Sequence, residues 1–405
     1  MENTPNIRFK GFVNDWEERK LDDISDVRDG THDTPKYLLQ GHPFITSKNV
    51  GGGYINYDNV QYISDSDFEE INKRSKVDKN DILMGMIGTI GNIALIRETP
   101  DFAIKNVALI KDVKKVNYLY LYHYLQSSNV LKQLSNGMDG GTQKFIALNK
   151  IRNLDILLPN EDEQQSVGEY LERLDNLITL HQRKCDETKE LKKYMLQKMF
   201  PKNGEKIPEI RFEGFTDDWE QRKLGNLVDK YEDPVETPDD GYERLGIRSH
   251  AKGTFHGYVE PGKELDTAKM HRVAANKLIL NITFAWEHAV AITDENDAGK
   301  LVSHRFPQFS FTCKLKPKFF KYVMLDRKFR EHLELSSPGG AGRNRVLKLN
   351  EMLDYVVKFP SVEEQKKISD YFDTLDNLIT LHQRKCNELK EVKKYMLQNM
   401  FPQKG

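Results

Sequence analysis

The sequence LDNLITLHQRKC stands at residues 174–185 and is written again, without a change, at 375–386. Farther out, PNIRFKGFVNDWEERKL at 5–21 returns as PEIRFEGFTDDWEQRKL at 208–224. The first pair of segments lies 201 positions apart and the second pair 203, so the stretches between them differ by two residues net. Self-similarity at this scale indicates two copies of one structural unit.

The segments between the repeated ends do not resemble each other. The first holds DGTHDTPKY (29–37) and DILMGMIGTIGN (81–92), and the second holds GIRSHAKGTFHGY (246–258) and KLILNITFAWEHAVAIT (277–293). The alternative is a plain tandem duplication whose halves drifted evenly, but exact identity beside dissimilar middles argues against it. We expect the shared parts to do one mechanical job and the unlike middles to bind different ligands.

Each copy also contains a stretch with the pattern of a coiled-coil seam. Between about Asp162 and Phe200 the only glycine is Gly168, and Pro201 is the first proline. Apolar or small residues recur there at alternating steps of four and three. The seam positions are Val167, Leu171, Leu174, Ile178, His181, Cys185, Thr188, Met195 and Met199, then Ile368, Phe372, Leu375, Ile379, His382, Cys386, Leu389, Met396 and Met400.

Two such helices, each roughly 54 Å long at about 1.5 Å per residue, are expected to bury their seams on each other. An antiparallel pair would place the two middles at opposite ends. The alternative is that each helix packs on its own domain. Pro201 and Pro402 are expected to end the helices.

The centre of the seam carries two histidines and two cysteines. His181 and Cys185 are four residues apart on one helix face, as are His382 and Cys386. Two His with two Cys is a zinc-binding set if the four side chains meet. The interpretation we prefer is a polar patch that sets the register of the two helices, and no metal site is predicted.

The bulk composition limits the possible functions. The chain has 405 residues, with 61 Lys and Arg against 62 Asp and Glu, for a formal net charge of −1. A bulk basic signature of nucleic-acid binding is therefore absent, and any DNA contact must come from local basic loops or be shared with a partner. Three scattered cysteines, no signal-peptide pattern and no long apolar run favour a cytoplasmic protein.

Motifs for chemistry are missing from the sequence. There is no Asn-Pro-Pro-aromatic motif of adenine methyltransferases, no G-x-x-x-x-G-K-[ST] phosphate loop and no H-E-x-x-H. The glycines of GMIGTIG at 85–91 do not have the dinucleotide-binding spacing and indicate tight turns. We predict a non-catalytic chain; an enzyme with an unrecognised site is an alternative.

Taken together, the sequence resembles the specificity (S) subunits of type I restriction–modification systems. The resemblance rests on the two repeated openings, on DGTHDTPKY, on the DIL…G..G stretch at 81–91, on P…EQ at 159–164 and 360–365, and on the repeated helices. It covers essentially the whole chain. No single motif is highly specific, but their order and their duplication are.

The resemblance implies a division of labour. Two target recognition domains would each read one half of a split double-stranded DNA site, and the helices would act as a spacer that docks two methyltransferase (M) subunits. Restriction (R) subunits would join for cleavage. S-adenosylmethionine would bind the M subunits, and ATP with Mg²⁺ the R subunits, with no cofactor in this chain. A non-DNA adaptor, with two interaction domains held apart by a coiled coil, is the competing interpretation.

The expected fold class is α+β. It consists of two globular α/β target recognition domains and two long antiparallel coiled-coil helices, related by a pseudo-twofold internal repeat. The expected boundaries are 1–161 for the first recognition domain, 162–200 for the first helix, 201–207 for a linker, 208–361 for the second recognition domain and 362–402 for the second helix.

Loop residues that can reach a groove or a phosphate are the candidate DNA contacts. In the first middle they are Arg28, Thr31, His32, Lys48, Asn49, Lys73, Arg74, Lys76, Gln143 and Lys144. In the second they are Arg248, His250, Lys252, His288, His304, Arg305, Arg343 and Arg345. For any one of them the alternative is a solvated surface charge. Trp286 is a core residue or a base-stacking group. The two middles end on corresponding segments, GGTQKFIALN at 140–149 and GGAGRNRVLKLN at 339–350.

A second set of residues is expected at interfaces. The members are Leu174, Ile178, His181, Cys185, Leu375, Ile379, His382 and Cys386 on the helices, with Trp16 and Trp219. The two tryptophans occupy identical repeat positions, so they are expected to be anchors or subunit contacts and not base readers.

Overall fold

The chain forms two compact units. The computed structural model describes residues 4–138, 144–202, 204–264, 269–339 and 345–402. Unit 1 consists of Met1–Arg183 and His382–Gly405, and unit 2 of Lys184–Leu381. Each unit takes one middle together with part of both long helices.

The first middle is built on a four-stranded antiparallel sheet with strand order β2-β10-β7-β8. The strands are β2 (Val27–Asp29), β7 (Ile82–Gly85), β8 (Ile93–Leu95) and β10 (Val107–Ile110). Ile82 and Met84 belong to one buried cluster and Leu83 to another, so the sheet is covered on both faces. Burial on both faces explains why these strands are continuous apolar runs without alternation.

A three-stranded sheet, β6-β3-β9, completes the first middle. It consists of β3 (His42–Thr46), β6 (Gln61–Ile63) and β9 (Ala103–Lys105), with β3 parallel to β9. Helix α2 (Asp65–Ser75) packs Phe68 and Ile71 on Phe44 and Ile63 of this sheet. The remaining short elements of the domain are α1 (Leu21–Ile24), η1 (Ser47–Asn49), β4 (Val50–Gly51), β5 (Tyr54–Ile55), α3 (Tyr118–Tyr124), α4 (Ser128–Asn136) and α5 (Leu148–Arg152).

The second middle repeats this framework despite its different sequence. Its four-stranded sheet has the equivalent order, β13-β21-β18-β19, and its second sheet contains β16-β15-β20 with β15 parallel to β20. The strands are β13 (Val228–Tyr231), β15 (Tyr242–Ile247), β16 (Thr254–Val259), β18 (Leu278–Leu280), β19 (Val290–Ile292), β20 (Leu301–Ser303) and β21 (Gln308–Phe311). Equivalent strands of the two middles share only their apolar character. Apolar character alone does not show, from the sequence, which strand of one middle corresponds to which strand of the other.

Additions distinguish the second middle. It lacks a counterpart of α2 among its described residues and instead extends the second sheet with β17 (Met270–Arg272) and β14 (Pro234–Val235). Its other elements are η2 (Leu224–Asn226), η3 (Ala285–Glu287), α7 (Pro317–Val323), α8 (Arg327–Leu335) and α9 (Leu349–Leu353). The expected α/β character holds for both domains.

A two-stranded sheet closes each domain at the repeated sequences. In unit 1, β1 (Glu17–Lys20) pairs with β11 (Asp155–Leu158), and in unit 2, β12 (Glu220–Lys223) pairs with β22 (Val356–Phe359). Trp16 and Trp219 precede these strands and are 2% and 3% exposed. Both tryptophans are thus core anchors within their own units.

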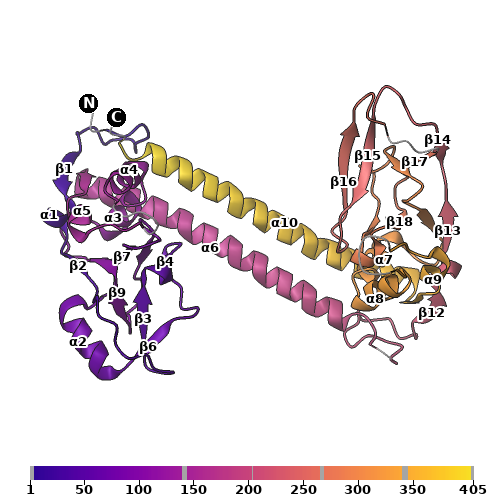
Figure 1. The fold of residues 1–405 in the computed structure, drawn as a ribbon, viewed down its shortest axis with the longest axis horizontal. Coiled ribbons are helices and arrows are strands. Elements are labelled where there is room, and N and C mark those ends of the chain that lie inside the picture. The colour runs from indigo at the N-terminus through magenta and orange to yellow at the C-terminus, as the bar shows by residue number, and fades with distance from the viewer. Residues whose placement is uncertain (1–3, 139–143, 203, 265–268, 340–344, 403–405) are drawn as a thin grey trace. The chain divides into compact units, whose positions relative to one another are not determined.

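The long helices are α6 (Glu161–Lys198) and α10 (Val362–Asn399). In unit 1, Asp175 meets Lys393 at 2.7 Å, and His181 Nδ1 lies 3.0 Å from His382 Nδ1. The residue numbers run in opposite directions, so the α6 and α10 segments of unit 1 are antiparallel, and they lie side by side in Figure 1.

Unit 2 contains the repeat-related pairing. Lys192 contacts Asp376 at 2.5 Å, and the Cys185 thiol points to the carbonyl oxygen of Ile379 at 3.8 Å. The seam positions named above are buried or half-buried in both copies. The antiparallel seam is therefore confirmed within each unit.

The residues that directly follow each long helix enter a domain core. In unit 1, Phe401 packs edge-on against Trp16, Tyr120 and Tyr124, with ring centroids 6.4, 5.7 and 5.2 Å away. In unit 2, Phe200 is the equivalent residue and lies 5.9 Å from the ring of Trp219. Each unit thus also packs the end of the helix that does not begin in it, and the alternative of packing only on the preceding domain is wrong.

The repeated opening motif holds the start of each domain to a long helix. Arg8 donates two hydrogen bonds to Glu163, at 2.7 and 2.8 Å, and the Glu163 side chain is fully buried. Arg211 makes the same pair with Glu364, at 2.8 Å for both bonds. The R of the repeated IRF and the E of the repeated EQ therefore form one buried ion pair per unit.

Candidate DNA interface in each unit

In unit 1, the loops that carry the candidate contacts meet at one place. The N–H of Thr31 donates to the carbonyl of Ile104 at 3.1 Å, and the Asn106 N–H returns a bond to the Thr31 carbonyl at 3.3 Å. Ser47 Oγ donates to the Asn106 carbonyl at 2.7 Å. A Cβ on Gly30 would lie 2.4 Å from the Ile104 carbonyl oxygen, so only glycine permits this approach.

A fourth and a fifth segment join the same place. Ser47 Oγ accepts a bond from the Met86 N–H at 3.1 Å, which attaches the glycine-rich 86–91 loop. The Gly88 N–H donates to the Lys144 carbonyl at 3.2 Å, and the Ile146 N–H donates to the Met86 carbonyl at 3.0 Å. The backbone thus brings Thr31, Lys48 and Lys144 into one region, although they are far apart in the sequence.

Asp29 organises the side chains of this region. Its carboxylate is 12% exposed and accepts from His32 Nε2 at 3.0 Å and from the guanidinium of Arg74. His32 Nδ1 lies 2.7 Å from Asn106 Oδ1. The side chains of His32 and Arg74 are nevertheless 63% and 66% exposed. Asp29 therefore orients both side chains while they remain accessible to a partner.

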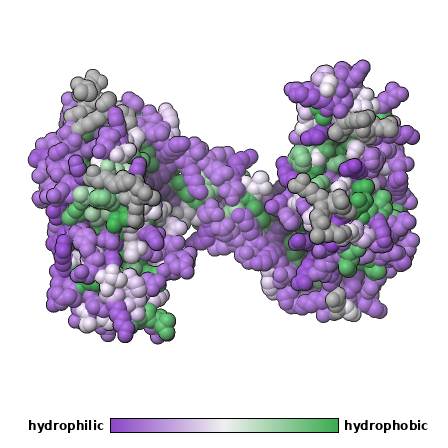
Figure 2. Space-filling model, in the orientation of Figure 1, coloured by the Kyte–Doolittle hydropathy of each residue, from purple (hydrophilic) through white to green (hydrophobic). Residues whose placement is uncertain are grey.

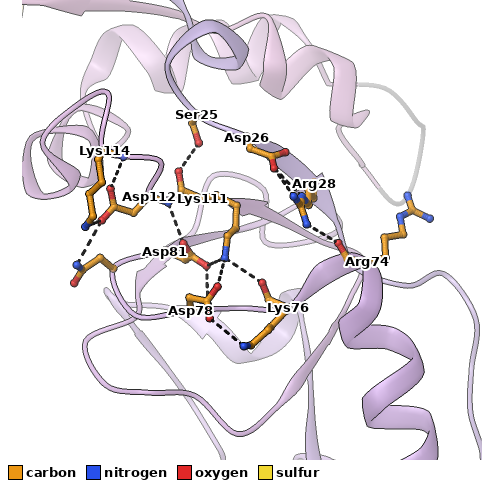
Figure 3. A network of polar contacts seen from close by, with 11 residues as sticks. Ser25, Asp26, Arg28, Arg74, Lys76, Asp78, Asp81, Lys111, Asp112 and Lys114 are labelled. Carbon is orange, nitrogen blue, oxygen red and sulfur yellow. Dashed lines mark hydrogen bonds and ion pairs between the residues drawn. The ribbon is translucent and has the colours of Figure 1, made fainter.

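Arg28 is less available than its sequence position indicates. It donates to Asp26 through Nε and Nη2, and its Nη1 donates to the Arg74 carbonyl at 3.1 Å (Figure 3). The bond from Arg28 lowers the pKa of the Asp26 carboxyl below its usual range, which keeps the pair charged. Arg28 thus holds the end of α2 against β2.

The basic cluster at the end of α2, Lys73, Arg74 and Lys76, lies beside a second set of ion pairs. Lys111 Nζ reaches Asp78 at 2.6 Å and the buried Asp81 at 2.7 Å, and Lys76 lies 3.7 Å from Asp78 (Figure 3). Lys76 and Lys73 are exposed, and Lys73 pairs with Glu70 at 2.6 Å. These two lysines remain accessible to an anionic partner.

The structure places the remaining candidates of unit 1 differently. Lys48 and Lys144 are exposed and Thr31 is half-buried, whereas Asn49 is 8% exposed. The Asn49 side chain accepts from Thr46 and donates to the Asn56 carbonyl at 3.0 Å, so it is used by the turn itself. Gln143 lies outside the described residues.

Unit 2 assembles its loops in the corresponding way. The N–H of His250 donates to the Glu287 carbonyl at 2.9 Å, and the Ile282 N–H donates to the Arg305 carbonyl at 3.0 Å. The Leu347 N–H donates to the Ile282 carbonyl at 2.9 Å, as Ile146 does to Met86 in unit 1. The loops that carry Arg248, Arg305 and Arg345 are thereby joined.

The side chains presented by unit 2 are different from those of unit 1. Arg248 lies over the Phe255 ring, 5.4 Å from its centroid, and Arg345 lies over the Trp286 ring at 5.5 Å. Trp286 is half-buried, so it is partly core and partly a support for an arginine. His250, Lys252, His304 and Arg305 are exposed. Arg343 lies outside the described residues.

His288 is a structural residue of the second site. It is 5% exposed, adopts the left-handed backbone conformation with φ 63°, and its Nε2 lies 2.8 Å from the Met324 carbonyl oxygen. Burial lowers the pKa of its imidazole, so it is neutral at pH 7 and donates to that carbonyl. We therefore leave His288 and Asn49 out of the candidate interface.

The family model described as the type I restriction modification DNA specificity domain matches residues 13–190 and 249–391. The chain belongs to this family. The matched ranges contain the loop cluster of unit 1, that of unit 2 except Arg248, and most of both long helices.

Curated members of the type I specificity family match over nearly the whole chain. A chain of Methanocaldococcus jannaschii that carries the provisional name of the MjaX specificity subunit is 23% identical, over 98% of this chain and 95% of its own length. The MjaVIII specificity subunit of the same organism is also 23% identical, over 95% and 91%.

Solved structures from type I restriction–modification systems have the same fold. The S subunit from M. genitalium superimposes with a TM-score of 0.63 at 13% identity, covering 99% of this chain and 100% of the other. A chain from a study of complex assembly and conformational transition of the type I system gives 0.50 at 15% identity, covering 96% and 98%. The α+β fold with two recognition domains and two long helices is thus confirmed.

The helix residues that were expected at interfaces pack within the seam between the two long helices. Leu174, Leu375, Cys185 and Cys386 are buried within the seam, and the other four helix positions are half-buried there. A different set of helix residues is exposed and lies at repeat-related positions. It comprises Leu177, Leu191 and Tyr194 on α6, with Leu378, Val392 and Tyr395 on α10. Figure 2 shows a face of the molecule that is mostly hydrophilic, with small apolar areas.

The cysteines of the seam are directed toward backbone oxygens. Cys386 Sγ lies 3.9 Å from the Ile178 carbonyl and 3.6 Å from Gln182 Oε1. Within the described ranges, the group of three potential metal ligands that come together is instead His123, Glu172 and Asp175. Arg97 and Lys393 already neutralise those two carboxylates, so the group is better explained as a polar joint. In the same described ranges, no helix has the length and apolarity needed to cross a membrane.

Asp29, Asn106 and Phe255 were missed from the sequence. An acid or an amide beside a glycine is not a DNA-contact signal in itself, and their role comes from orienting a neighbouring cation or histidine. No sequence signal marks Asp29, because its role depends on the burial of its carboxylate and on the approach of Arg74 from α2.

Proposed function

We propose that this chain is the DNA-sequence-specificity subunit of a type I restriction–modification complex, and that each unit reads one half of a bipartite, asymmetric site. The observation that carries the proposal is the pairing of one framework with two different sets of loop side chains. His32 and Arg74 occupy the loop cluster of unit 1, whereas Arg248 and His250 occupy that of unit 2. Equivalent scaffolds with unlike donors suit two different half-sites.

The exposed donors have the chemistry for base readout. Arginine donates to guanine O6 and N7, and each good bidentate pair gives about 1–3 kcal/mol of discrimination. Arg74 and Arg248 are each held on one side, by Asp29 and by Phe255 respectively, which reduces the entropy lost on binding. Lys48, Lys73 and Lys76 would supply phosphate contacts that fix the position of unit 1 on the duplex.

The long helices have two tasks in this proposal. As continuous 38-residue elements shared by both units, they set the gap between the half-sites. Their exposed, repeat-related Leu and Tyr side chains suit two copies of one partner, and we assign them to two methyltransferase (M) subunits. R subunits join this assembly for cleavage.

Catalysis is assigned to the partners. S-adenosylmethionine would bind the M subunits for adenine methylation, and ATP with Mg²⁺ the R subunits. The three cysteines of this chain are free thiols, which suits a reducing cytoplasm. With a net charge of −1, the isolated chain is expected to bind DNA weakly until M subunits close around the duplex.

Mapping of methylated adenines tests the proposal. Cells that express this chain with its M subunits should carry methylated adenines in one bipartite sequence with an unread gap. Cells with the M subunits alone should not. Methylation without this chain, or a chain that binds M subunits but directs no sequence preference, would favour the adaptor interpretation instead.

A further inference from the structure

One exposed edge recurs at the same position in both units. Lys144 and Phe145 directly precede Ile146, and Arg345 and Val346 directly precede Leu347. Ile146 and Leu347 are 1% and 4% exposed, and their N–H groups make the equivalent bonds to Met86 and Ile282 described above. The backbone of each edge is therefore fixed from one side by a buried residue.

Each edge lies within the loop cluster of its unit. The Gly88 N–H donates to the Lys144 carbonyl, and Ile87 forms a β-bridge with Phe145. In unit 2, the guanidinium of Arg345 lies over the Trp286 ring and 3.7 Å from a Glu334 carboxylate oxygen. These contacts join each edge to the loop that follows β7 or β18.

The chemistry of the edge is the same in both units. A cation stands next to an apolar side chain that is 43% exposed in Phe145 and 50% in Val346. Within the described ranges, Lys144 has no ion pair, so its charge is available to an anion. Arg345 is 28% exposed and is held in orientation by Trp286.

Repetition separates backbone contact from base contact. Residues that read bases should differ between the units, because the half-sites are different. A cation and an apolar neighbour kept at one position in both units suit what both half-sites share, which is phosphate and deoxyribose. We propose that Lys144–Phe145 and Arg345–Val346 are one repeated edge that docks the DNA sugar–phosphate backbone, the cation on a phosphate and the apolar side chain on the adjoining sugar.

This inference rests on the proposed function, and salt dependence tests it. In the complex with M subunits, Lys144→Gln or Arg345→Gln should each reduce the slope of log affinity against log salt by about 0.9, because one phosphate contact is lost. The reduction should be equal on duplexes with and without the recognition sequence, and the methylated sequence should not change. Lys144→Arg should restore the slope.

Lys318→Gln is the matched control, because it removes the same charge outside the edge. Lys318 is an exposed lysine of α7 and lies 3.7 Å from Asp373 of α10. Its slope should equal that of the wild type. An unchanged slope in both edge variants, or a change of methylated sequence in either, overturns the backbone assignment. A wild-type complex that methylates no bipartite sequence overturns the proposed function itself, and that result is visible before any variant is made.

Discussion

His123 and Tyr322 occupy equivalent places in the two units and face equivalent pairs of acids. The N–H before each helix, at Asn117 and Lys316, donates to the side chain of Gln164 or Gln365 at 2.9 Å, which aligns α3 with α7. Tyr322 donates its hydroxyl to Asp373 at 2.6 Å. The ring nitrogens of His123 lie beside Glu172 and Asp175 without a hydrogen-bond partner in the described structure.

His123→Tyr should therefore stabilise unit 1. The tyrosine hydroxyl can reach a Glu172 or Asp175 carboxylate as Tyr322 reaches Asp373, and it replaces unpaired buried nitrogens. A gain of about 1–2 kcal/mol in the free energy of unfolding is expected from one such charged hydrogen bond. Urea unfolding of the full chain measures it, and His123→Phe, which offers no hydroxyl, is the control. A loss of stability with tyrosine would mean that the site has no room for it.

The stability of unit 1 should fall in mild acid. Burial, with Lys393 and Arg97 nearby, lowers the pKa of His123 well below its ordinary value of 6.5. In the unfolded chain the His123 imidazole binds a proton near pH 6.5, whereas in the folded chain it stays neutral at that pH. The neutral His123 therefore contributes its full share to the free energy of unfolding above pH 6.5. Below that pH this share falls by up to about 1.4 kcal/mol per pH unit. His123→Phe should remove this part of the slope between pH 6.5 and 5; an identical slope in the variant would contradict the assignment.

Arg8→Ala should be strongly destabilising. The substitution leaves the fully buried Glu163 carboxylate without its cation, at a cost of about 3–5 kcal/mol. Arg211→Ala should cost a similar amount through Glu364, and because the pairs lie in different units the two effects should add. Arg19→Ala, which removes an exposed pair with Glu17, is the control and should change stability by less than about 1 kcal/mol.

Loop substitutions should separate the two half-sites. Arg74→Ala should relax base choice in one half of the methylated sequence only, and Arg248→Ala in the other half only, each by about 1–3 kcal/mol per base pair. Sequencing of methylated adenines shows both halves in one experiment. Relaxation of both halves by a single substitution would contradict the assignment of one half-site to each unit.

The sequence predicted the long helices and their seam, because a strict spacing of apolar residues has few other structural explanations. It also predicted the α/β character of both middles. It did not predict that the two middles share a framework, since strands such as β7 and β18 require only buried apolar side chains and not particular residues. Pairwise contacts over long sequence separations were equally inaccessible, as in Phe401 with Trp16 and Arg8 with Glu163.

The candidate site was predicted in outline only. The clustering of the loops follows from backbone hydrogen bonds such as those of Thr31 and His250, and backbone geometry has no residue signature. Polar residues in loops could not be divided in advance into those that serve the turn, such as Asn49 and His288, and those left open, such as His32 and Lys144. That division depends on burial, which only the folded loops define.

The composition of the two units has a consequence for synthesis. Unit 2 is one continuous stretch of chain, whereas unit 1 needs both Met1–Arg183 and His382–Gly405. The domain that leaves the ribosome first is therefore the last to be completed, because the Ile7 N–H must wait for the Asn399 carbonyl and Trp16 for Phe401. In unit 2 the corresponding partners of Ile210 and Trp219, at Lys198 and Phe200, have already emerged. Loss of His382–Gly405 would thus damage unit 1, although its recognition domain lies far upstream, and would leave every residue of unit 2 in place.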